Sequence, residues 1–306
     1  MTPWSKTRAR FVGLMLSGAA IPFFANAPAG AFTGRLSIDV AGQKRSAVMV
    51  EPERLKRSPR TVVIVLHGAT NGSGRRIQSN LGLDEFLRAN GAVAVYPDAI
   101  DGGWNVTGGP GPDDPAFLRA LAAKLVADGI ADRRKIFLVG ASTGGMLALR
   151  VGCQAPDYLA GVGALIAGLP ATLAASCKPA PSAFFLMNGT ANPLAPWQGG
   201  KANLGGFKED ILSAEATLAL FAAANGCASQ RVAREYPDRD PTDGSRVVME
   251  RLSGCKHVVE LVRVEGGGHT LPGRPARSDR GQSVGAQNRD VNISGLIVAF
   301  LRQSLR

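Results

Sequence analysis

The chain has 306 residues, of which 45% are apolar, and carries a formal net charge of +11. This apolar share is sufficient for one well-buried α/β domain. The basic residues are scattered and form neither a basic helix nor a pattern interleaved with aromatic residues, so a nucleic-acid partner is not expected.

The first 31 residues have the parts of a secretory signal peptide. Three basic residues, Lys6, Arg8 and Arg10, precede an apolar run over residues 11–24, and small residues follow. A membrane anchor is the alternative, but the run is too short to span a bilayer comfortably and Pro22 interrupts it. We therefore predict a secreted or periplasmic protein without a stable membrane anchor.

The cleavage site is expected after Ala31 or Ala29. Cleavage after Ala27 is disfavoured because Pro28 would follow the cut. Removal of residues 1–31 takes away three basic and no acidic residues, so the formal charge falls from +11 to +8. The mature chain, residues 32–306, is predicted to form a single domain, with modest attraction for acidic polymers or anionic surfaces.

The cysteines of an exported chain usually pair. Four are present, and sequence alone allows three pairings. They are Cys153, Cys177, Cys227 and Cys255. No pair has metal-ligand spacing with a histidine nearby, so we expect neither a metal nor another cofactor.

The mature chain begins with signals for strands. Two alternating runs, 35–40 and 46–50, are joined at residues 41–43 and indicate an antiparallel hairpin at the sheet edge. The continuous apolar runs 61–66 and 92–96 are typical of strands buried on both faces. Between them, residues 70–76 predict a polar loop and residues 83–90 a helix.

Helices and strands alternate in the rest of the chain. Residues 98–112 predict a loop over one end of the sheet, with Trp104 exposed, and Asp113 and Asp114 begin a helix that reaches about residue 128. Strands are predicted at 135–139, 161–166, 183–187, 247–252 and 258–264, and helices at 213–225 and 291–302. The expected fold is therefore α/β, a mostly parallel sheet with an N-terminal antiparallel hairpin and helices on both faces.

Ser142 lies in a Gly-x-Ser-x-Gly pattern, residues 140–144, between an apolar strand and a helical run. This is the context of a nucleophile elbow, in which two glycines let strand and helix pass closely. The same pattern recurs at residues 281–285, but inside a polar, arginine-rich loop. We therefore predict Ser142 as the nucleophile and Ser283 as an ordinary loop serine.

A serine nucleophile needs a base, and the chain has three histidines. His67 occupies a His-Gly turn after a buried strand, where an imidazole more often supports the loop than moves protons. His257 opens a strand with no glycine around it and is predicted to be a structural or surface residue. His269 lies in a glycine-rich loop after the last strand, so it is the predicted base, and the order serine, acid, histidine is that of α/β-hydrolases.

Ester attack also needs donors for the developing oxyanion. The usual pair is the amide after the nucleophile and one in the loop after the third strand. Here these are Thr143 and Ala69. The alternative for Gly68-Ala69 is a plain strand-ending turn.

Short motifs that occur together extend over nearly the whole mature chain. They are the elbow 140–145, His67-Gly68, Tyr96-Pro97-Asp98, Trp104-Asn105, Asp113-Asp114, Asn188-Gly189-Thr190, Asn225-Gly226-Cys227, Gly254-Cys255, Gly266-Gly267-Gly268-His269-Thr270, Pro272-Gly273 and Arg289-Asp290-Val291-Asn292. In combination they resemble the secreted polyhydroxybutyrate depolymerase-like and feruloyl esterase-like family of α/β-hydrolases. The resemblance implies a serine esterase with little or no lid, and disulfides Cys153–Cys177 and Cys227–Cys255.

The sequence departs from this family at the acid of the triad. The family motif Gly-Thr-x-Asp-Pro reads Gly-Thr-Ala-Asn-Pro here, so the acid position is Asn192. In a Ser-His-Asp enzyme that exchange costs on the order of 10⁴-fold in turnover. A second departure is Leu271, where relatives commonly carry a tryptophan that shapes the substrate wall.

Other carboxylates are weaker candidates for the acid position. Glu209 and Asp210 lead into a helix and Asp290 looks like a helix start, while a polar excursion expected to face solvent holds Asp238, Asp240 and Asp243. The predicted triad is therefore Ser142, His269 and Asn192.

Two substrate classes fit the predicted site. They are short-chain hydroxyalkanoate esters, including polymeric ones, and hydroxycinnamoyl or acetyl esters of plant polysaccharides. Trp104 and Trp197 are the predicted walls of the substrate pocket, with packing as the alternative for each. An interpretation from another class is a degenerate hydrolase fold kept as a binding protein, which Asn192 motivates.

Overall fold

The computed structural model describes residues 31–52, 59–68, 72–154, 156–204, 206–274 and 284–306. The predicted signal peptide, except for Ala31, lies outside these residues, and so do Ala69 and Ser283.

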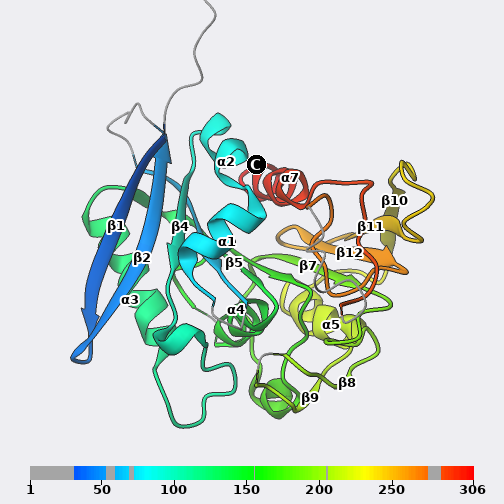
Figure 1. The fold of residues 1–306 in the computed structure, drawn as a ribbon, viewed down its shortest axis with the longest axis horizontal. Helices are drawn as coiled ribbons and strands as arrows, with labels where there is room; N and C mark the ends of the chain where they lie inside the picture. Colours follow the sequence, from blue (N-terminus) through cyan, green and yellow to red (C-terminus); the bar gives the residue numbers. More distant parts are fainter. Residues whose placement is uncertain (1–30, 53–58, 69–71, 155, 205, 275–283) are drawn as a thin grey trace, which may run out of the picture.

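The strands of the main sheet in the described chain are β1 (Ala31–Val40), β2 (Gln43–Pro52), β3 (Arg60–Leu66), β4 (Val93–Pro97), β5 (Ala131–Ala141), β6 (Gly161–Leu165), β7 (Ala183–Gly189), β10 (Arg231–Glu235), β11 (Arg246–Leu252) and β12 (Val259–Glu265). Their order is β1-β2-β4-β3-β5-β6-β7-β12-β11-β10 (Figure 1). The central strands from β4 to β12 run parallel, and antiparallel pairs close both edges. The predicted mostly parallel sheet with an N-terminal hairpin is confirmed.

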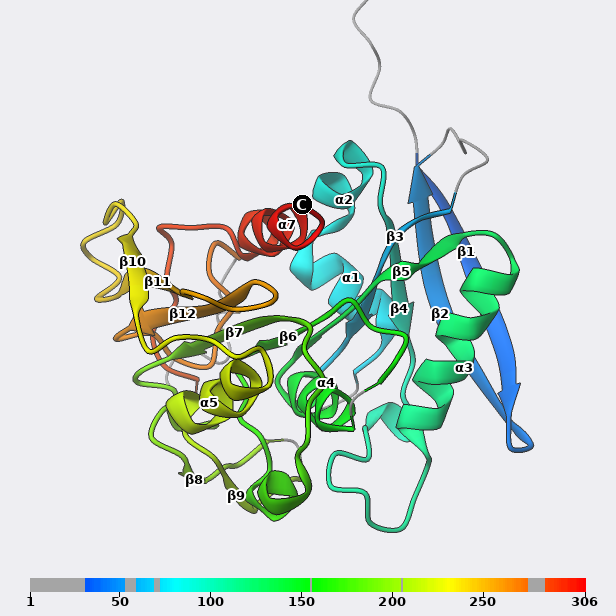
Figure 2. The same cartoon turned by 180° about the vertical axis from the view of Figure 1, so that it is seen from behind.

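Helices cover both faces of the sheet (Figures 1 and 2). On one face lie α1 (Gly74–Leu81), α2 (Asp84–Ala89) and α7 (Ile293–Ser304), and on the other α3 (Asp114–Ala127), α4 (Thr143–Cys153) and α5 (Ala214–Ala224). The shorter elements are η1 (Ile100–Gly102), η2 (Ala171–Ser176), β8 (Gly200–Lys201) and β9 (Asp210–Ile211). Both helix layers were expected from the alternation of strands and helices.

The core is divided by the sheet into two apolar clusters. In β3, Ile64 packs with the cluster under α3, α4 and α5, while Val63 and Val65 pack with the cluster under α1, α2 and α7. Successive side chains of a strand point to opposite faces, so a strand covered on both sides needs a continuous apolar run. This is why residues 61–66 show no polar alternation.

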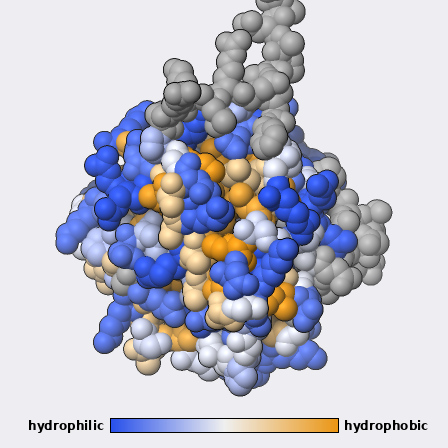
Figure 3. All heavy atoms as spheres, turned by 90° about the vertical axis from the view of Figure 1, so that its left-hand side faces the viewer, coloured by the Kyte–Doolittle hydropathy of each residue, from blue (hydrophilic) through white to orange (hydrophobic). Residues whose placement is uncertain are grey.

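The N-terminal hairpin closes through a two-residue turn. Val40 pairs with Gln43, and the intervening Ala41 and Gly42 have φ of 51° and 76°. Positive φ at both central residues is the geometry that matches the twist of hairpin strands. Figure 3 looks onto this side of the molecule, where a narrow strip of apolar surface runs between hydrophilic residues.

The prediction of a loop over residues 70–76 is wrong at its end, because α1 begins at Gly74. Ser73 caps the helix by accepting the Arg76 N–H at 3.2 Å, and the Gly74 N–H donates to Asp98 Oδ1 at 2.9 Å. A capping serine favours a helix start. Because a glycine and two arginines follow Ser73, the sequence shows no apolar periodicity here that would indicate a helix.

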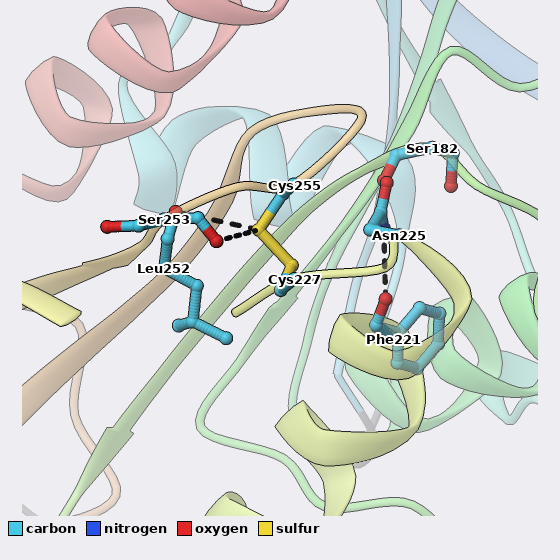
Figure 4. Close-up of a disulfide and its surroundings, with 7 residues drawn as sticks. All are labelled: Ser182, Phe221, Asn225, Cys227, Leu252, Ser253 and Cys255. Carbon is cyan, nitrogen blue, oxygen red and sulfur yellow. Dashed lines mark hydrogen bonds between the residues drawn. A yellow bond between two sulfur atoms is a disulfide. The ribbon is translucent and has the colours of Figure 1, made fainter. Parts of the chain in front are cut away.

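Both predicted disulfides are present. Cys153–Cys177 joins the end of α4 to the residue after η2, and Cys227–Cys255 joins the segment after α5 to the turn before β12 (Figure 4). The pairing agrees with the one that the family resemblance implied. None of the helices in the described ranges is long and apolar enough to cross a membrane.

Candidate active site

Three predicted site residues lie at one edge of the sheet, where the parallel strands end. Ser142 follows β5, Asn192 follows β7 and His269 follows β12. In the sheet order, β12 neighbours β7, and β6 alone separates β7 from β5. The carboxyl ends of parallel strands share one edge, so this topology gathers residues far apart in the chain.

Ser142 has the strained backbone of a nucleophile elbow. Its φ of 58° and ψ of −126° are rare for a residue with a side chain. Its N–H donates to the Leu165 carbonyl at 2.9 Å. A Cβ at Gly140 would stand 2.0 Å from the Gly144 carbonyl oxygen, and one at Gly144 would stand 2.4 Å from that of His67. Close backbone approach therefore requires both glycines of the motif.

The Ser142 hydroxyl, the His269 ring and the Asn192 amide form a continuous hydrogen-bonded chain. His269 Nε2 lies 3.0 Å from Ser142 Oγ, and His269 Nδ1 lies 3.2 Å from Asn192 Oδ1. An amide oxygen accepts and does not donate, so Nδ1 carries the ring proton and Nε2 accepts the serine O–H. The arrangement provides a nucleophile, a base and an orienting group.

The His269 ring is kept neutral by its surroundings. Burial lowers the pKa of His269 to about 4, and the Asn192 amide brings no charge that would offset this effect. At neutral pH the ring is therefore unprotonated at Nε2 and able to accept a proton. The same absence of charge makes the protonated ring costly.

The predicted oxyanion donors are described in part. Thr143 is the first residue of α4, and the first N–H groups of a helix have no acceptor within it. Gly68, which follows β3, lies against the serine, since a Cβ at Gly68 would be 3.1 Å from Ser142 Cβ. Ala69, the second donor, lies outside the described residues, and its role stays a prediction.

His67 supports the loop that follows β3, as expected. Its Nδ1 lies 2.8 Å from the Gly68 carbonyl oxygen, and its Nε2 accepts the Ala99 N–H at 3.1 Å. Burial lowers the pKa of the ring, which stays neutral between these two partners. The engagement of both nitrogens leaves His67 no lone pair for Ser142.

The prediction that Trp104 is exposed is wrong. Its side chain is 8% exposed, because the indole N–H donates to the His67 carbonyl at 2.8 Å and the two rings pack with centroids 4.7 Å apart. Trp197 is buried in the core under α5, and Leu271 packs partly against the core under α7. Their contacts with a substrate stay predictions.

Asp290 does not start a helix. Asn292 caps α7 and its side chain accepts the Ser294 N–H at 2.9 Å, whereas Asp290 is buried and accepts the backbone N–H groups of Arg239 at 2.7 Å and Asp240 at 3.2 Å. Asp290 therefore holds the polar segment around Arg239 and Asp240 against the residues that precede α7.

The other candidate acids also hold surface loops. Asp243 accepts the Arg289 N–H at 2.8 Å, and Asp210 lies 3.4 Å from Lys201 in the small β8–β9 sheet. His257 is exposed just before β12, as predicted. Within the described residues, no group of three or more histidine, cysteine or acidic side chains could hold a metal ion.

The residue that the sequence analysis missed is Asn188, near the end of β7. Its side chain is 1% exposed, and its Oδ1 accepts from Asn192 Nδ2 at 2.8 Å. The available signal was a polar amide directly after the apolar run 183–187. Buried amides in such positions need partners on both sides.

Known proteins resemble this chain over most of its length. A family model described as "Alpha/beta hydrolase family" matches residues 63–278. "Putative esterase NocK" of Nocardia uniformis subsp. tsuyamanensis is 30% identical over 301 residues, covering 89% of this chain and 83% of that protein. "Probable feruloyl esterase C" of Aspergillus terreus is 27% identical, with 68% of each chain covered.

A solved structure shares the fold. "Acetyl xylan esterase from Aspergillus awamori" aligns with a TM-score of 0.53 at 14% identity, covering 77% of this chain and 94% of that one. The family match contains the elbow, the turn at Asn192 and the loop that carries His269. The chain therefore belongs to the alpha/beta hydrolase family.

Proposed function

We propose that this protein is an exported serine esterase that hydrolyses carboxylic esters. The observation that carries the proposal is the hydrogen-bonded chain from Ser142 through His269 to Asn192, with the serine on an elbow at the end of a central strand. The names of the esterase relatives support the same reaction class.

In the proposed acylation step, Ser142 Oγ attacks the ester carbonyl carbon and its proton passes to His269 Nε2. The N–H groups of Thr143 and Ala69 hold the oxyanion. Collapse of the tetrahedral intermediate breaks the bond to the alcohol oxygen, which takes the proton from His269. Water then repeats the sequence on the acyl-serine, releases the acid and restores Ser142.

Asn192 orients the ring in this scheme but cannot stabilise its positive charge. The exchange of a triad aspartate for asparagine costs on the order of 10⁴-fold, or about 5.5 kcal/mol of barrier, in Ser-His-Asp enzymes. We therefore expect a slow esterase.

Two ester classes are the candidate substrates. The names of the feruloyl and acetyl xylan esterases support hydroxycinnamoyl or acetyl esters of plant polysaccharides. The motif resemblance to polyhydroxybutyrate depolymerases supports short-chain hydroxyalkanoate esters. Initial rates with methyl ferulate, acetylated xylan and a 3-hydroxybutyrate ester, each at equal concentration, separate the classes.

The first experiment is initial-rate hydrolysis of p-nitrophenyl butyrate by the mature protein, with Ser142→Ala as the blank. We expect slow turnover that Ser142→Ala abolishes, and labelling of Ser142 by a fluorophosphonate. A degenerate hydrolase fold that only binds its ligand predicts neither. Wild-type rates equal to the Ser142→Ala blank, together with an unlabelled Ser142, would overturn the esterase proposal.

A further inference from the structure

The contacts of the Asn192 side chain fix which atom of its amide faces His269. Its Oδ1 accepts from the backbone N–H groups of Leu194 and Ala195, both at 3.0 Å, and from the Nδ1–H of His269 at 3.2 Å. Exchange of the amide oxygen and nitrogen would set an NH₂ group against two backbone donors. The turn after β7 therefore presents an oxygen to His269.

The other end of the Asn192 amide is held by Asn188. Asn192 Nδ2 donates to Asn188 Oδ1 at 2.8 Å. With the amide reversed, two oxygens would face each other at this distance. A buried polar group without a partner costs about 1–3 kcal/mol, so the contact discriminates strongly between the two orientations.

Asn188 is itself fixed from two sides. Its Oδ1 also accepts the Gly189 N–H at 2.9 Å, and its Nδ2 donates to the Ala195 carbonyl at 3.2 Å. Rotation of this amide would oppose a donor to Gly189 and an acceptor to Ala195. The backbone of β7 and of the following turn thus determines which atom Asn188 offers to Asn192.

We propose that Asn188 is a positioning residue that fixes the orientation of the Asn192 amide and, through it, the Nδ1-protonated tautomer of His269. The proposal rests on the esterase reaction for its functional meaning, because only this tautomer leaves Nε2 free to take the serine proton. Without Asn188, Asn192 Nδ2 loses its acceptor, and only the Leu194 and Ala195 N–H groups still oppose a reversed amide. A share of the molecules can then turn the Asn192 NH₂ group toward Nδ1, which moves the ring proton to Nε2 and removes the base.

The test measures the tautomer directly. ¹⁵N-labelled histidine gives separate signals for the protonated and bare nitrogens of a neutral ring, and the chain has three histidines to assign. A His269→Gln variant identifies the His269 signals. At pH 7, we expect wild type to show the proton on Nδ1 and Asn188→Leu to show a large share of the ring with the proton on Nε2.

Activity provides the second readout. We expect Asn188→Leu to lower kcat about tenfold or more, in step with the loss of the Nδ1-protonated ring, with KM little changed. Asn188→Asp is the conservative variant: when protonated, its carboxyl can donate to the Ala195 carbonyl and accept from Asn192 and Gly189. It should keep the wild-type tautomer. Asn188→Ala, which also removes the acceptor for Asn192 Nδ2, is the second variant if Asn188→Leu does not fold, and the same tautomer shift is expected of it.

Asn225→Leu is the matched control. Asn225 is also 1% exposed, and its Nδ2 donates to the Ser182 and Phe221 carbonyls at 2.9 Å, close to the Cys227–Cys255 disulfide (Figure 4). The Asn225→Leu substitution removes an amide that is as buried as that of Asn188 but has no hydrogen bond with Asn192. We expect lower stability with an unchanged His269 tautomer.

The outcomes separate the two proposals. A shifted tautomer in Asn188→Leu alone supports the positioning role even if no ester is hydrolysed, in which case only the proposed function fails. A His269 ring that stays Nδ1-protonated in Asn188→Leu, or that shifts equally in Asn225→Leu, overturns the positioning role, whatever the esterase assay shows.

Discussion

Burial of the His269 ring, beside an uncharged residue at position 192, determines how this ring responds to pH. The pKa of His269 is lowered to about 4 by burial, and the ring must be unprotonated to act as the base. The proposed activity is therefore present above this pKa and is lost as pH falls through it. We expect kcat/KM of the wild type to decline only near pH 4.

A carboxylate at position 192 should move this decline to higher pH. In Asn192→Asp the negative charge stabilises the protonated ring, so the pKa of His269 rises and the acidic limb of kcat/KM shifts upward by about one unit or more. We expect kcat to rise only about tenfold, well short of the ~10⁴-fold that separates the two triads. The limit comes from Asn188, because its Oδ1, which now accepts from Asn192 Nδ2, would face the second oxygen of a carboxylate at position 192.

The measurement is the pH–rate profile of both proteins from pH 3.5 to 8 with p-nitrophenyl butyrate. An unshifted acidic limb in Asn192→Asp would contradict the placement of residue 192 beside the ring. A gain of several orders of magnitude would show that Asn188 turns easily and does not constrain its neighbour.

Single residues of the site differ in how well the sequence reveals them. Ser142 and His269 could be predicted because strand, glycine and helix signals surround them. The burial of Trp104 and the bridging role of Asn188 could not, because each depends on a partner that only the folded chain supplies, the His67 carbonyl and the Asn192 amide respectively.

A buried ion pair links helix α3 to the N-terminal hairpin. Arg45 of β2 lies 2.7 Å from Asp114, and the two side chains are 3% and 0% exposed. Asp114 also accepts the Asn105 N–H at 2.7 Å, which holds the loop before α3. The pair therefore links three elements around one carboxylate.

Removal of this carboxylate should destabilise the protein severely. We expect Asp114→Asn to lower the free energy of unfolding by about 3–5 kcal/mol, because the Arg45 charge stays buried without its partner. The matched control is Asp157→Asn in the Arg119 pair, whose side chains are 57% and 83% exposed, with an expected cost of about 0–1 kcal/mol. Urea unfolding followed by circular dichroism compares them, and equal midpoints for the two variants would refute the argument.

Strands that are buried on both faces were predicted correctly from the sequence, whereas the exposed strand at the edge of the sheet was not. The run 61–66 identifies β3 because both faces need apolar side chains. Strand β10 was missed because Arg231, Arg234 and Glu235 show no buried face, and every residue of the strand is exposed. Pairing with β11 forms it, and pairing leaves little trace in a sequence.

At the scale of the whole molecule, two disulfides cross-link the half that carries α4, α5 and β12. They close loops with sequence separations of 24 and 28 residues. Chain-entropy arguments give about 3 kcal/mol for each loop of this size. Such bonds form in oxidising compartments, which supports the proposed export.

Reduction should therefore lower thermal stability strongly. We expect the melting temperature to fall in excess dithiothreitol, and the double variant Cys227→Ser with Cys255→Ser to reproduce about half of the effect without reductant. Calorimetry measures both. Intact mass under non-reducing conditions is the control, and four free thiols in protein recovered from an oxidising compartment would contradict the pairing.

The exposed edge of the sheet at β10 bears on whether molecules of this protein associate with one another at high concentration. An edge strand can add a strand from another molecule, and natural sheets prevent this with charged side chains. Here Arg231 is held by Glu215 and Glu250, and Arg234 and Glu235 follow, with Val232 as the large exposed apolar residue of the strand. The charges that hid this strand from sequence-based prediction thus also disfavour its growth into aggregates.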